Sequence, residues 1–450
     1  MSERVSFHDL SKLDAAGRDA LMRRTEADLE PYLETVRPIV ERVRREGDAA
    51  LVHYARELDK AELRADQLRA TAADFARARA ELEPEVTEAI AYAVSNIRQV
   101  HEAQKPKAFW LDEVRPGVFA GERTVPIPSV ACYVPRGKGA FPSVTMMTTV
   151  PAMVAGVKRA IIVTPPGPGG AFDAATLVAA ETVGVTEVYR VGGAQAVAAV
   201  AYGTETLPKV AKIVGPGSPW VVAAKRLLAD RIDTGLPAGP SESIVLADGT
   251  ADGRMAALDL IIESEHGPDS SAYLVTDSAE VAEAAMAALP GYWAMLGEQR
   301  AGFSKAVLCG PRGGIVLAPD FDAAVAFVND YAPEHLEILS AEPLAHLGRI
   351  ENAAEVLLGP HTPITLGNFV IGVNCVLPTS GAARTWSALS VHDFQKRISV
   401  AHVTAKGYPD LAKQAHALAA YEGFDGHALA VSKLRDDLLG RAPPKKPLIH

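Results

Sequence analysis

Cysteine is scarce in this 450-residue sequence, which contains only Cys132, Cys309 and Cys375. An odd number of widely spaced cysteines excludes a disulfide framework, and the sequence has no CxxC pattern typical of a metal site. We therefore expect a reducing compartment, the cytoplasm. The sequence also lacks the apolar core of a signal peptide, because MSERVSFHDLSKLDAAG at its start carries charges where that core would lie.

Long hydrophobic runs and an excess of positive charge are absent as well. The most apolar region, residues 143–157, is interrupted by threonines and Pro151 and ends at Lys158 and Arg159, so it is unsuited to crossing a bilayer. The net charge is −10 at pH 7. Because binding to nucleic acid or to an anionic membrane requires clustered lysine and arginine, we expect neither partner.

Apolar residues make up 48% of the chain, which is enough for a large core. The sequence has four regions that differ in their pattern of apolar and polar residues. Residues 1–125 have helical spacing and then short strands. Residues 126–242 alternate apolar strands with helices, which predicts a parallel sheet covered on both faces. Residues 243–383 repeat that alternation, and residues 384–450 resemble a helical tail. The sequence therefore predicts an α/β protein with two consecutive sheet domains.

Two glycine-rich loops, VGGAQA at 191–196 and VGPGSPW at 214–220, each follow a predicted strand and precede a predicted helix. Ligands of open parallel sheets bind at the carboxyl ends of strands, where N–H groups at a helix N-terminus can hold a phosphate. Neither loop is GxGxxG, so a plain tight turn remains the alternative to a cofactor contact. Ser218 is a candidate N-cap for the second of these helices.

A second pattern is the pair Glu263 and His266 in LDLIIESEHGPDS. Their spacing of three places both side chains on one helix face, an arrangement that can hold a divalent metal. The alternative is a solvated helix end with His266 near the last carbonyl groups. The polar turn after His266 favours a location at a domain surface.

Three further segments contain candidate catalytic or binding residues. YAPEHLEI places Glu334 and His335 side by side at the edge of a predicted strand. Residues 362–385 combine glycine, proline and asparagine with many apolar residues, which indicates an ordered wall of a site. AYEGFDGHALAVSKL places Glu422 and His427 before an amphipathic helix near the C-terminus, where a lone histidine is most often a surface residue.

Several motifs together resemble the histidinol dehydrogenase family over nearly the whole chain: GGAQA, AGPSES, EHGPDS, YAPEHLEI, LPTSGAARTWSALSVHDFQKR and EGFDGHALAV. The resemblance implies a zinc-dependent homodimer that oxidises a primary amino alcohol to a carboxylate in two NAD-dependent steps through a bound aldehyde. It also implies two Rossmann-like domains, the first on the NAD side and the second on the catalytic and metal side. The helical C-terminal tail would cross to the partner subunit.

The same resemblance implies roles for individual residues. His335 would take the alcohol proton as hydride leaves and later the proton of the hydrated aldehyde, and Glu334 would activate the water. The alternative is a surface Glu–His pair. The implied metal ligands are Glu263, His266, Asn368 and His427. Glu263 stands where the family has glutamine and Asn368 where it has aspartate, so a carboxylate and an amide have exchanged places without a change in total charge.

Substrate contacts are implied for Ser143, Ser241 and Glu422, which match the family, and for Cys375, which replaces a histidine. A thiol cannot make the hydrogen bonds of an imidazole.

The implied NAD contacts are Tyr133, Gln195 and Ser218, the last replacing an asparagine. The changes at Glu263, Asn368 and Cys375 favour a paralogue that oxidises a small polar primary alcohol other than histidinol. The alternatives are histidinol dehydrogenase proper, which converts L-histidinol to L-histidine, and a catalytically silent protein that binds NAD or metal.

Overall fold

The computed structural model describes residues 4–24, 29–136 and 139–440. The chain divides into two compact units, each built from two separate segments. The first unit comprises Met1–Lys105 and Pro126–Phe394, and the second comprises Pro106–Val125 and Gln395–His450.

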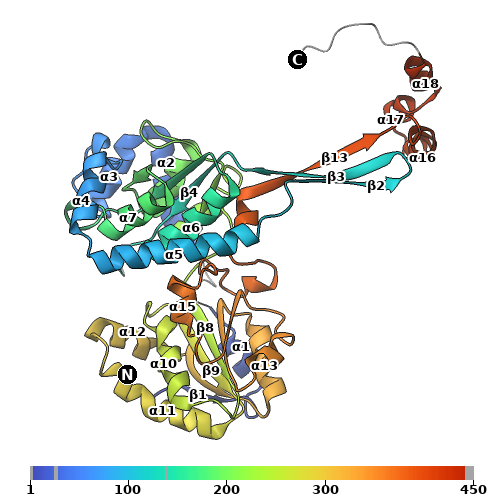
Figure 1. Ribbon diagram of the computed structural model, residues 1–450. Coiled ribbons are helices and arrows are strands. Elements are labelled where there is room, and N and C mark those ends of the chain that lie inside the picture. The colour runs from blue at the N-terminus through green and yellow to red at the C-terminus, as the bar shows by residue number, and fades with distance from the viewer. Residues whose placement is uncertain (1–3, 25–28, 137–138, 441–450) are drawn as a thin grey trace. The chain divides into compact units, whose positions relative to one another are not determined.

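One parallel sheet of the first unit has four strands in the order β6-β5-β4-β7. Figure 1 labels its strand β4. The strands are β4 (Ser129–Tyr133), β5 (Arg159–Val163), β6 (Val188–Tyr189) and β7 (Lys212–Val214). The chain crosses over in opposite directions from β4, so the carboxyl ends of β4 and β7 form a topological switch point, where ligands of such sheets bind.

Helices cover both faces of this sheet, because its apolar side chains point alternately to the two sides. One face packs against α2 (Glu30–Glu46), α3 (Asp48–Glu57), α8 (Gly193–Tyr202) and α9 (Pro219–Leu227). The other face packs against α4 (Ala72–Glu81), α5 (Pro84–Ala103), α6 (Pro142–Ala155) and α7 (Ala174–Val183).

The second parallel sheet of this unit has six strands in the order β1-β10-β9-β8-β11-β12. The strands are β1 (Phe7–Asp9), β8 (Glu242–Ala247), β9 (Ser271–Thr276), β10 (Gly313–Leu317), β11 (His335–Leu339) and β12 (Glu355–Leu358). The edge strand β1 comes from the N-terminal region, for which the sequence predicted helices followed by short strands. Three residues are too few to show the alternation by which a strand is recognised.

One face of the second sheet packs against α10 (Gly253–Ser264), α11 (Ala279–Trp293) and α12 (Glu298–Leu308). The other face packs against α1 (Ala15–Leu21) and α13 (Phe321–Tyr331). Short helices complete the unit: η2 (Ala65–Gln67), η3 (Pro168–Gly170), α14 (Pro343–Leu347), α15 (Ile364–Phe369), η4 (Ala382–Arg384) and η5 (Val391–Phe394). Because α10 connects the parallel neighbours β8 and β9, it runs back along the sheet and ends near the amino ends of the strands.

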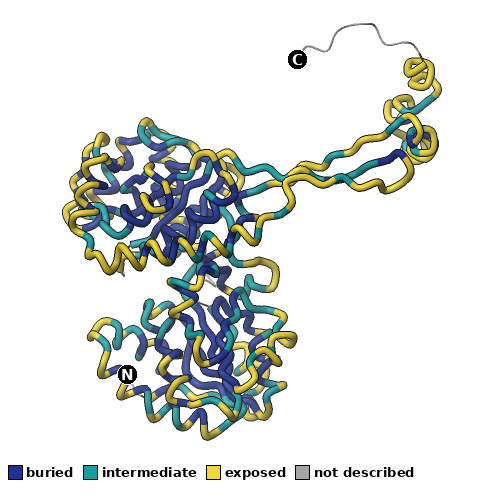
Figure 2. Tube along the Cα trace, in the orientation of Figure 1, coloured by how far each residue is buried: buried dark blue, intermediate teal, exposed yellow. Residues whose placement is uncertain are grey.

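The described residues of the second unit form a three-stranded sheet in the order β13-β3-β2 and three helices. Its elements are β2 (Phe109–Arg115), β3 (Val118–Pro126), β13 (Gln395–Val403), α16 (Tyr408–Tyr421), α17 (Asp425–Ala430) and α18 (Lys433–Leu439). The prediction of a helical tail over residues 384–450 is therefore wrong for β13. This strand is exposed along most of its length (Figure 2), so it lacks the alternation of buried and polar residues that marks a strand.

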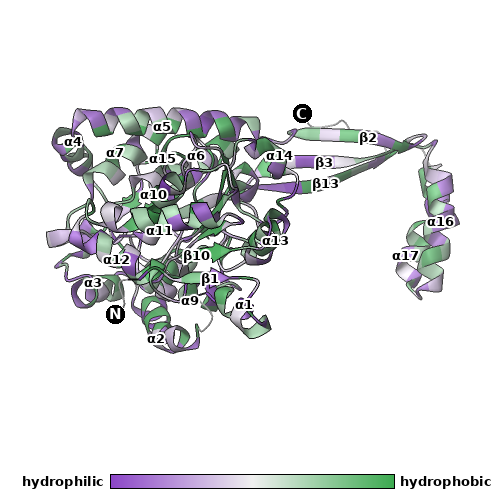
Figure 3. Ribbon diagram, turned by 90° about the horizontal axis from the view of Figure 1, so that it is seen from below, coloured by the Kyte–Doolittle hydropathy of each residue, from purple (hydrophilic) through white to green (hydrophobic). Residues whose placement is uncertain are grey.

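Large apolar side chains remain exposed on the second unit. Figure 3 shows hydrophobic residues, in green, among polar ones along its strands and helices. They lie on its strands and helices: Phe109, Trp110, Val114, Ile398, Val403, Leu418, Tyr421, Phe424, Leu429, Leu434, Leu438 and Leu439. Apolar surface of this extent is typical of a region that another molecule covers. Crossing of this segment to a partner subunit stays a prediction.

The predicted fold class, α/β with parallel sheets and many helices, is confirmed. The three predicted boundaries between the four regions stay predictions. Within the described ranges 4–24, 29–136 and 139–440, the helices are all too short or too polar to cross a bilayer.

Candidate active site

The imidazole of His335 lies between two carboxyl groups at the amino edge of the second sheet. His335 is the first residue of β11 and is in register with Glu355, the first residue of β12. Its Nδ1 lies 2.7 Å from Oε2 of Glu355, and its Nε2 lies 3.9 Å from Oε1 of Glu334. All three side chains are buried. Because an ionised carboxylate only accepts hydrogen bonds, the short contact places a proton on Nδ1.

The carboxyl group of Glu334 is held by the backbone. The N–H of Glu242, the first residue of β8, donates to Oε2 of Glu334 at 2.8 Å. Glu242 is itself anchored by Arg24, whose Nε donates to it at 2.9 Å, and by the N–H of Ser380 at 2.8 Å. Burial raises the pKa of Glu334 well above its usual range, although His335 opposes this effect. Glu334 is therefore an immobilised carboxyl group with raised basicity.

The charges around His335 favour its protonated form. Burial alone would lower the pKa of His335, but the carboxylate of Glu263, the hydrogen bond to Glu355 and the charge of Glu334 raise this pKa to about 10. Four acidic or basic side chains from three elements thus share one buried region. Such a grouping is typical of sites that move protons.

Three of the four residues predicted to hold the metal, Glu263, His266 and Asn368, lie together beside this group. Oε1 of Glu263, near the end of α10, accepts a hydrogen bond of 2.7 Å from Nδ2 of Asn368 on α15. Oε2 of Glu263 lies 3.1 Å from Nδ1 of His266, and the hydroxyl group of Ser241 also bonds to Glu263. Glu263 is only 1% exposed, so the alternative of a solvated helix end does not describe it. Ser241, Glu263, His266 and Asn368 therefore form one contact group.

These donors fit a zinc ion. They comprise a buried carboxylate, an amide and an imidazole, and zinc accepts oxygen and nitrogen ligands. Nδ1 of His266 also lies 3.1 Å from the carbonyl oxygen of Ile262, so its proton is used there and Nε2 is available for a metal. Within the described part of the chain, no three histidine, cysteine, aspartate or glutamate side chains are grouped to hold a metal. The set in the first unit has two such side chains and the amide of Asn368.

Cys375 lies in the segment predicted to form a wall of the site. Burial raises the pKa of its thiol, and the carboxylates of Glu355, Glu334 and Glu263 raise it further. The segment is ordered by internal contacts, such as the bond of 2.7 Å from Asn374 to the carbonyl oxygen of Met147. Cys375 therefore presents a neutral thiol, a weak hydrogen-bonding group, to the acidic cluster.

Two of the predicted NAD contacts lie at the carboxyl edge of the first sheet. Tyr133 ends β4, and its hydroxyl oxygen accepts the N–H of Gly193 at the start of α8. Nε2 of Gln195 lies 3.5 Å from Oδ2 of Asp59, whose pKa is raised by burial to about 6. Oε1 of Gln195 is buried and has no hydrogen-bond partner among the described residues. This oxygen lies near the topological switch point of the first sheet, so it can accept a hydrogen bond from a ligand that binds there.

Two glycines at this edge are required by close packing within the chain. A Cβ at Gly192 would lie 2.3 Å from Cγ of Pro165, and one at Gly215 would lie 2.2 Å from the carbonyl oxygen of Tyr133. Gly215 also has φ of +113°, a region that favours glycine. Ser218 occupies the N-cap position of α9, as predicted, but its side chain makes no capping hydrogen bond. The two glycines thus allow tight turns before α8 and α9, and the N-termini of helices are places where phosphates can bind.

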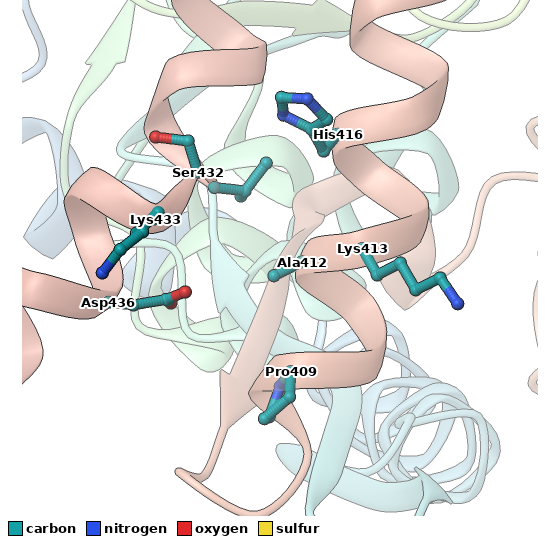
Figure 4. Close-up of a pocket in the computed structure, with 8 residues that line it drawn as sticks. Pro409, Ala412, Lys413, His416, Ser432, Lys433 and Asp436 are labelled. Carbon is teal, nitrogen blue, oxygen red and sulfur yellow. The ribbon is translucent and has the colours of Figure 1, made fainter.

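The remaining predicted site residues lie on other elements. Ser143 is buried near the start of α6 in the first unit. Glu422 follows α16, and His427 lies on α17, both exposed in the second unit. A pocket of this unit is lined by residues of α16 and α18 and the turn before α18, including Lys413, His416 and Asp436 (Figure 4). The predicted residues Glu422 and His427 do not line it.

Glu355 and Asp59 were not predicted from the sequence. A signal for Glu355 is present, because it is the single charged residue in the otherwise apolar strand EVLL. Asp59 follows the end of α3 and resembles an ordinary surface aspartate in the sequence. Its proximity to Gln195 depends on tertiary packing.

Comparison with known proteins gives a consistent result. The family model for histidinol dehydrogenase matches residues 22–435. A histidinol dehydrogenase homolog of Cereibacter sphaeroides is 64% identical over 97% of this chain and 99% of its own. The histidinol dehydrogenase of a Synechocystis species is 49% identical over 96% of this chain and 99% of its own.

The crystal structure of histidinol dehydrogenase from Elizabethkingia anophelis superposes with a TM-score of 0.91 at 30% identity, covering 97% of this chain and 99% of that chain. Sequence and fold thus agree over nearly the full length. The chain belongs to the histidinol dehydrogenase family, whose members are NAD-dependent, zinc-binding oxidoreductases acting on CH–OH groups.

Proposed function

We propose that this protein oxidises a small polar primary alcohol other than histidinol to the carboxylate, through a bound aldehyde, as a cytoplasmic homodimer. The observation that carries the proposal is the composition of the buried cluster around His335. It keeps Glu334 and His335 in place but presents a neutral thiol, Cys375, where the family has an imidazole. The relative from Cereibacter sphaeroides, named only as a homolog, supports a paralogous group.

In the first oxidation, Nε2 of His335 takes the proton of the alcohol oxygen as hydride leaves the carbon that bears this oxygen. The proton on Nδ1 stays in its hydrogen bond to Glu355, so the imidazolium that forms faces a carboxylate. When bound, NAD would supply the hydride acceptor and zinc would supply a Lewis acid for the substrate oxygen, and the positive charge of both groups would favour the neutral form of His335.

In the second oxidation, the carboxylate of Glu334 takes a proton from water as the water oxygen adds to the aldehyde carbon. Its raised pKa makes Glu334 a stronger base than an exposed glutamate. His335, after releasing the first proton to solvent, takes the hydroxyl proton of the hydrate as the second hydride leaves. One alcohol and one water thus yield a carboxylate, with two hydrides transferred and three protons released.

The proposed ligands and contacts are those that the family resemblance implies. Zinc would be held by Glu263, His266, Asn368 and, from the other subunit, His427. NAD would be held by Tyr133, Gln195 and Ser218. The substrate would be contacted by Ser143, Ser241, Cys375 and Glu422.

The experiment is a panel of primary alcohols with NAD, followed by NADH absorbance and by product analysis. We expect a small polar alcohol to give two NADH per molecule and a carboxylate product, with a higher kcat/KM than histidinol. If histidinol has the highest kcat/KM, the protein is histidinol dehydrogenase proper. If NADH forms with none of the alcohols although NAD and zinc bind, the catalytically silent alternative holds.

A further inference from the structure

Glu355 contacts the proposed base directly. Its Oε2 lies 2.7 Å from Nδ1 of His335, and the two side chains are 5% and 3% exposed. The strands hold the pair in register, because the N–H of Glu355 donates to the carbonyl oxygen of Glu334 at 3.1 Å. Backbone pairing therefore holds the two residues opposite each other on neighbouring strands.

We propose that Glu355 is a positioning residue for His335: it keeps the proton on Nδ1, directs Nε2 toward the substrate and stabilises the imidazolium formed in each oxidation. This inference rests on the proposed function, in which His335 is the base. A base must offer an unprotonated nitrogen in a defined direction, and a carboxylate on the opposite nitrogen supplies both conditions.

The burial of Glu355 has no structural advantage of its own. Its Oε1 is buried without a hydrogen-bond partner in the described part of the chain. Leaving such an oxygen unsatisfied is unfavourable, and an apolar side chain at this position would suit the following Val, Leu and Leu of β12. The acidic residue is therefore best explained by its partner His335.

A glycine on the neighbouring helix makes room for Glu355. A Cβ at Gly367 would lie 2.7 Å from Oε1 of Glu355, a distance that requires one of them to move. Gly367 immediately precedes Asn368 on α15. The carboxyl group of Glu355 thus fills the space between His335 and the helix that carries a proposed metal ligand.

Glu355→Gln tests the role with a side chain of the same size. If the amide oxygen faces Nδ1, the tautomer is kept but the charge is lost; if the amide nitrogen faces it, the proton moves to Nε2. Both orientations lower kcat, by about 10-fold or more, while KM for the alcohol, NADH affinity and melting temperature stay close to wild type. The matched control is Glu351→Gln, an exposed residue of the same segment, which should change none of these quantities.

A variant cycle tests the contact itself. Gly367→Ala should lower kcat in the wild-type background by displacing the carboxyl group, and it should have little further effect when Glu355→Ala is present. The inference is overturned if Glu355→Gln is folded and retains kcat within about 3-fold of wild type while His335→Asn is inactive. If His335→Asn itself stays active, the proposed function fails first, so the two failures are distinguishable.

Discussion

Nδ2 of Asn368 donates a hydrogen bond of 2.7 Å to Oε1 of Glu263 and so joins α15 to the end of α10. Burial opposes ionisation of Glu263, but His266 and His335, together with the bonds from Asn368 and Ser241, lower its pKa. The carboxylate charge is therefore kept at a buried position by its neighbours. The exchange of an amide and a carboxylate relative to the family thus occurs between two residues in direct contact.

This contact predicts coupled effects on zinc. Glu263→Gln should reduce the zinc retained after dialysis, because it removes the only anionic ligand of the proposed set. Adding Asn368→Asp to that variant restores one carboxylate and should restore much of the zinc. Metal content of the wild type, both single variants and the double variant, measured by elemental analysis, tests the expectation.

Glu265→Gln is the control for this series, because Glu265 lies two residues from Glu263 and undergoes the same loss of charge. It should keep the zinc content of the wild type. Strictly additive effects of the two changes would mean that Glu263 and Asn368 do not share one ion.

The second prediction concerns the proposed base. His335→Asn should lower kcat by about 10²–10⁴-fold, the usual contribution of a general base. NADH affinity should stay near wild type, since Tyr133 and Gln195 lie on the first sheet and its helices. Single-turnover rates and NADH fluorescence titration measure the two quantities.

His361→Asn is a suitable control, because His361 is exposed in the same unit. A His335→Asn variant that keeps more than a tenth of the wild-type kcat would remove His335 from the mechanism.

The sequence predicted the alternation of strands and helices correctly because buried parallel strands are short apolar runs, such as RAIIV and ESIVLA. The ligand rule for open sheets also suits the first sheet, where Tyr133 ends β4 and Gly215 follows β7. In the second sheet the candidate group lies instead at the amino ends of β8, β11 and β12. The direction of α10, which ends at that edge, explains the difference.

The sequence does not predict which side chains face each other across neighbouring strands. Glu334 and His335 are neighbours in the chain and were recognised together. Glu355 lies 20 residues from His335, and their contact depends on the register of β11 with β12. Register follows from the packing of a whole sheet, so a single sequence does not reveal which acidic residue will face a given histidine.

The third prediction concerns Asp59, which burial gives a pKa of about 6 in place of the usual 3.8. The folded protein binds this proton more tightly than the unfolded chain, so the associated stability is present below about pH 4 and is lost as the pH rises through 6. Asp59→Asn should therefore raise the melting temperature relative to wild type at pH 8 and much less at pH 4.5. Thermal unfolding at both values tests the sign.

The same variant should bind NADH more weakly, because Asp59 lies beside Gln195 at the proposed NAD site. Asp66→Asn is its control. Asp66 is exposed, and the guanidinium group of Arg64 lowers its pKa, so its loss should not stabilise the protein at pH 8. An equal change in melting temperature for Asp59→Asn at both pH values would contradict the assignment of burial as the cause.

The last prediction is that subunits share their active sites. His335 belongs to the first unit and His427 to the second, and the second unit exposes an unusual amount of apolar surface. Mixing His335→Asn with His427→Asn, each inactive alone, should restore activity after subunit exchange. About one quarter of wild-type activity is expected, because half of the dimers are hybrids and each hybrid has one complete site.

The control mixture is His335→Asn with Glu263→Gln: both changes lie in the first unit, so every site of a hybrid carries one of them and activity should stay absent. Equal behaviour of the two mixtures, despite hybrid dimers detected by native mass spectrometry, would show that each site is built from a single chain.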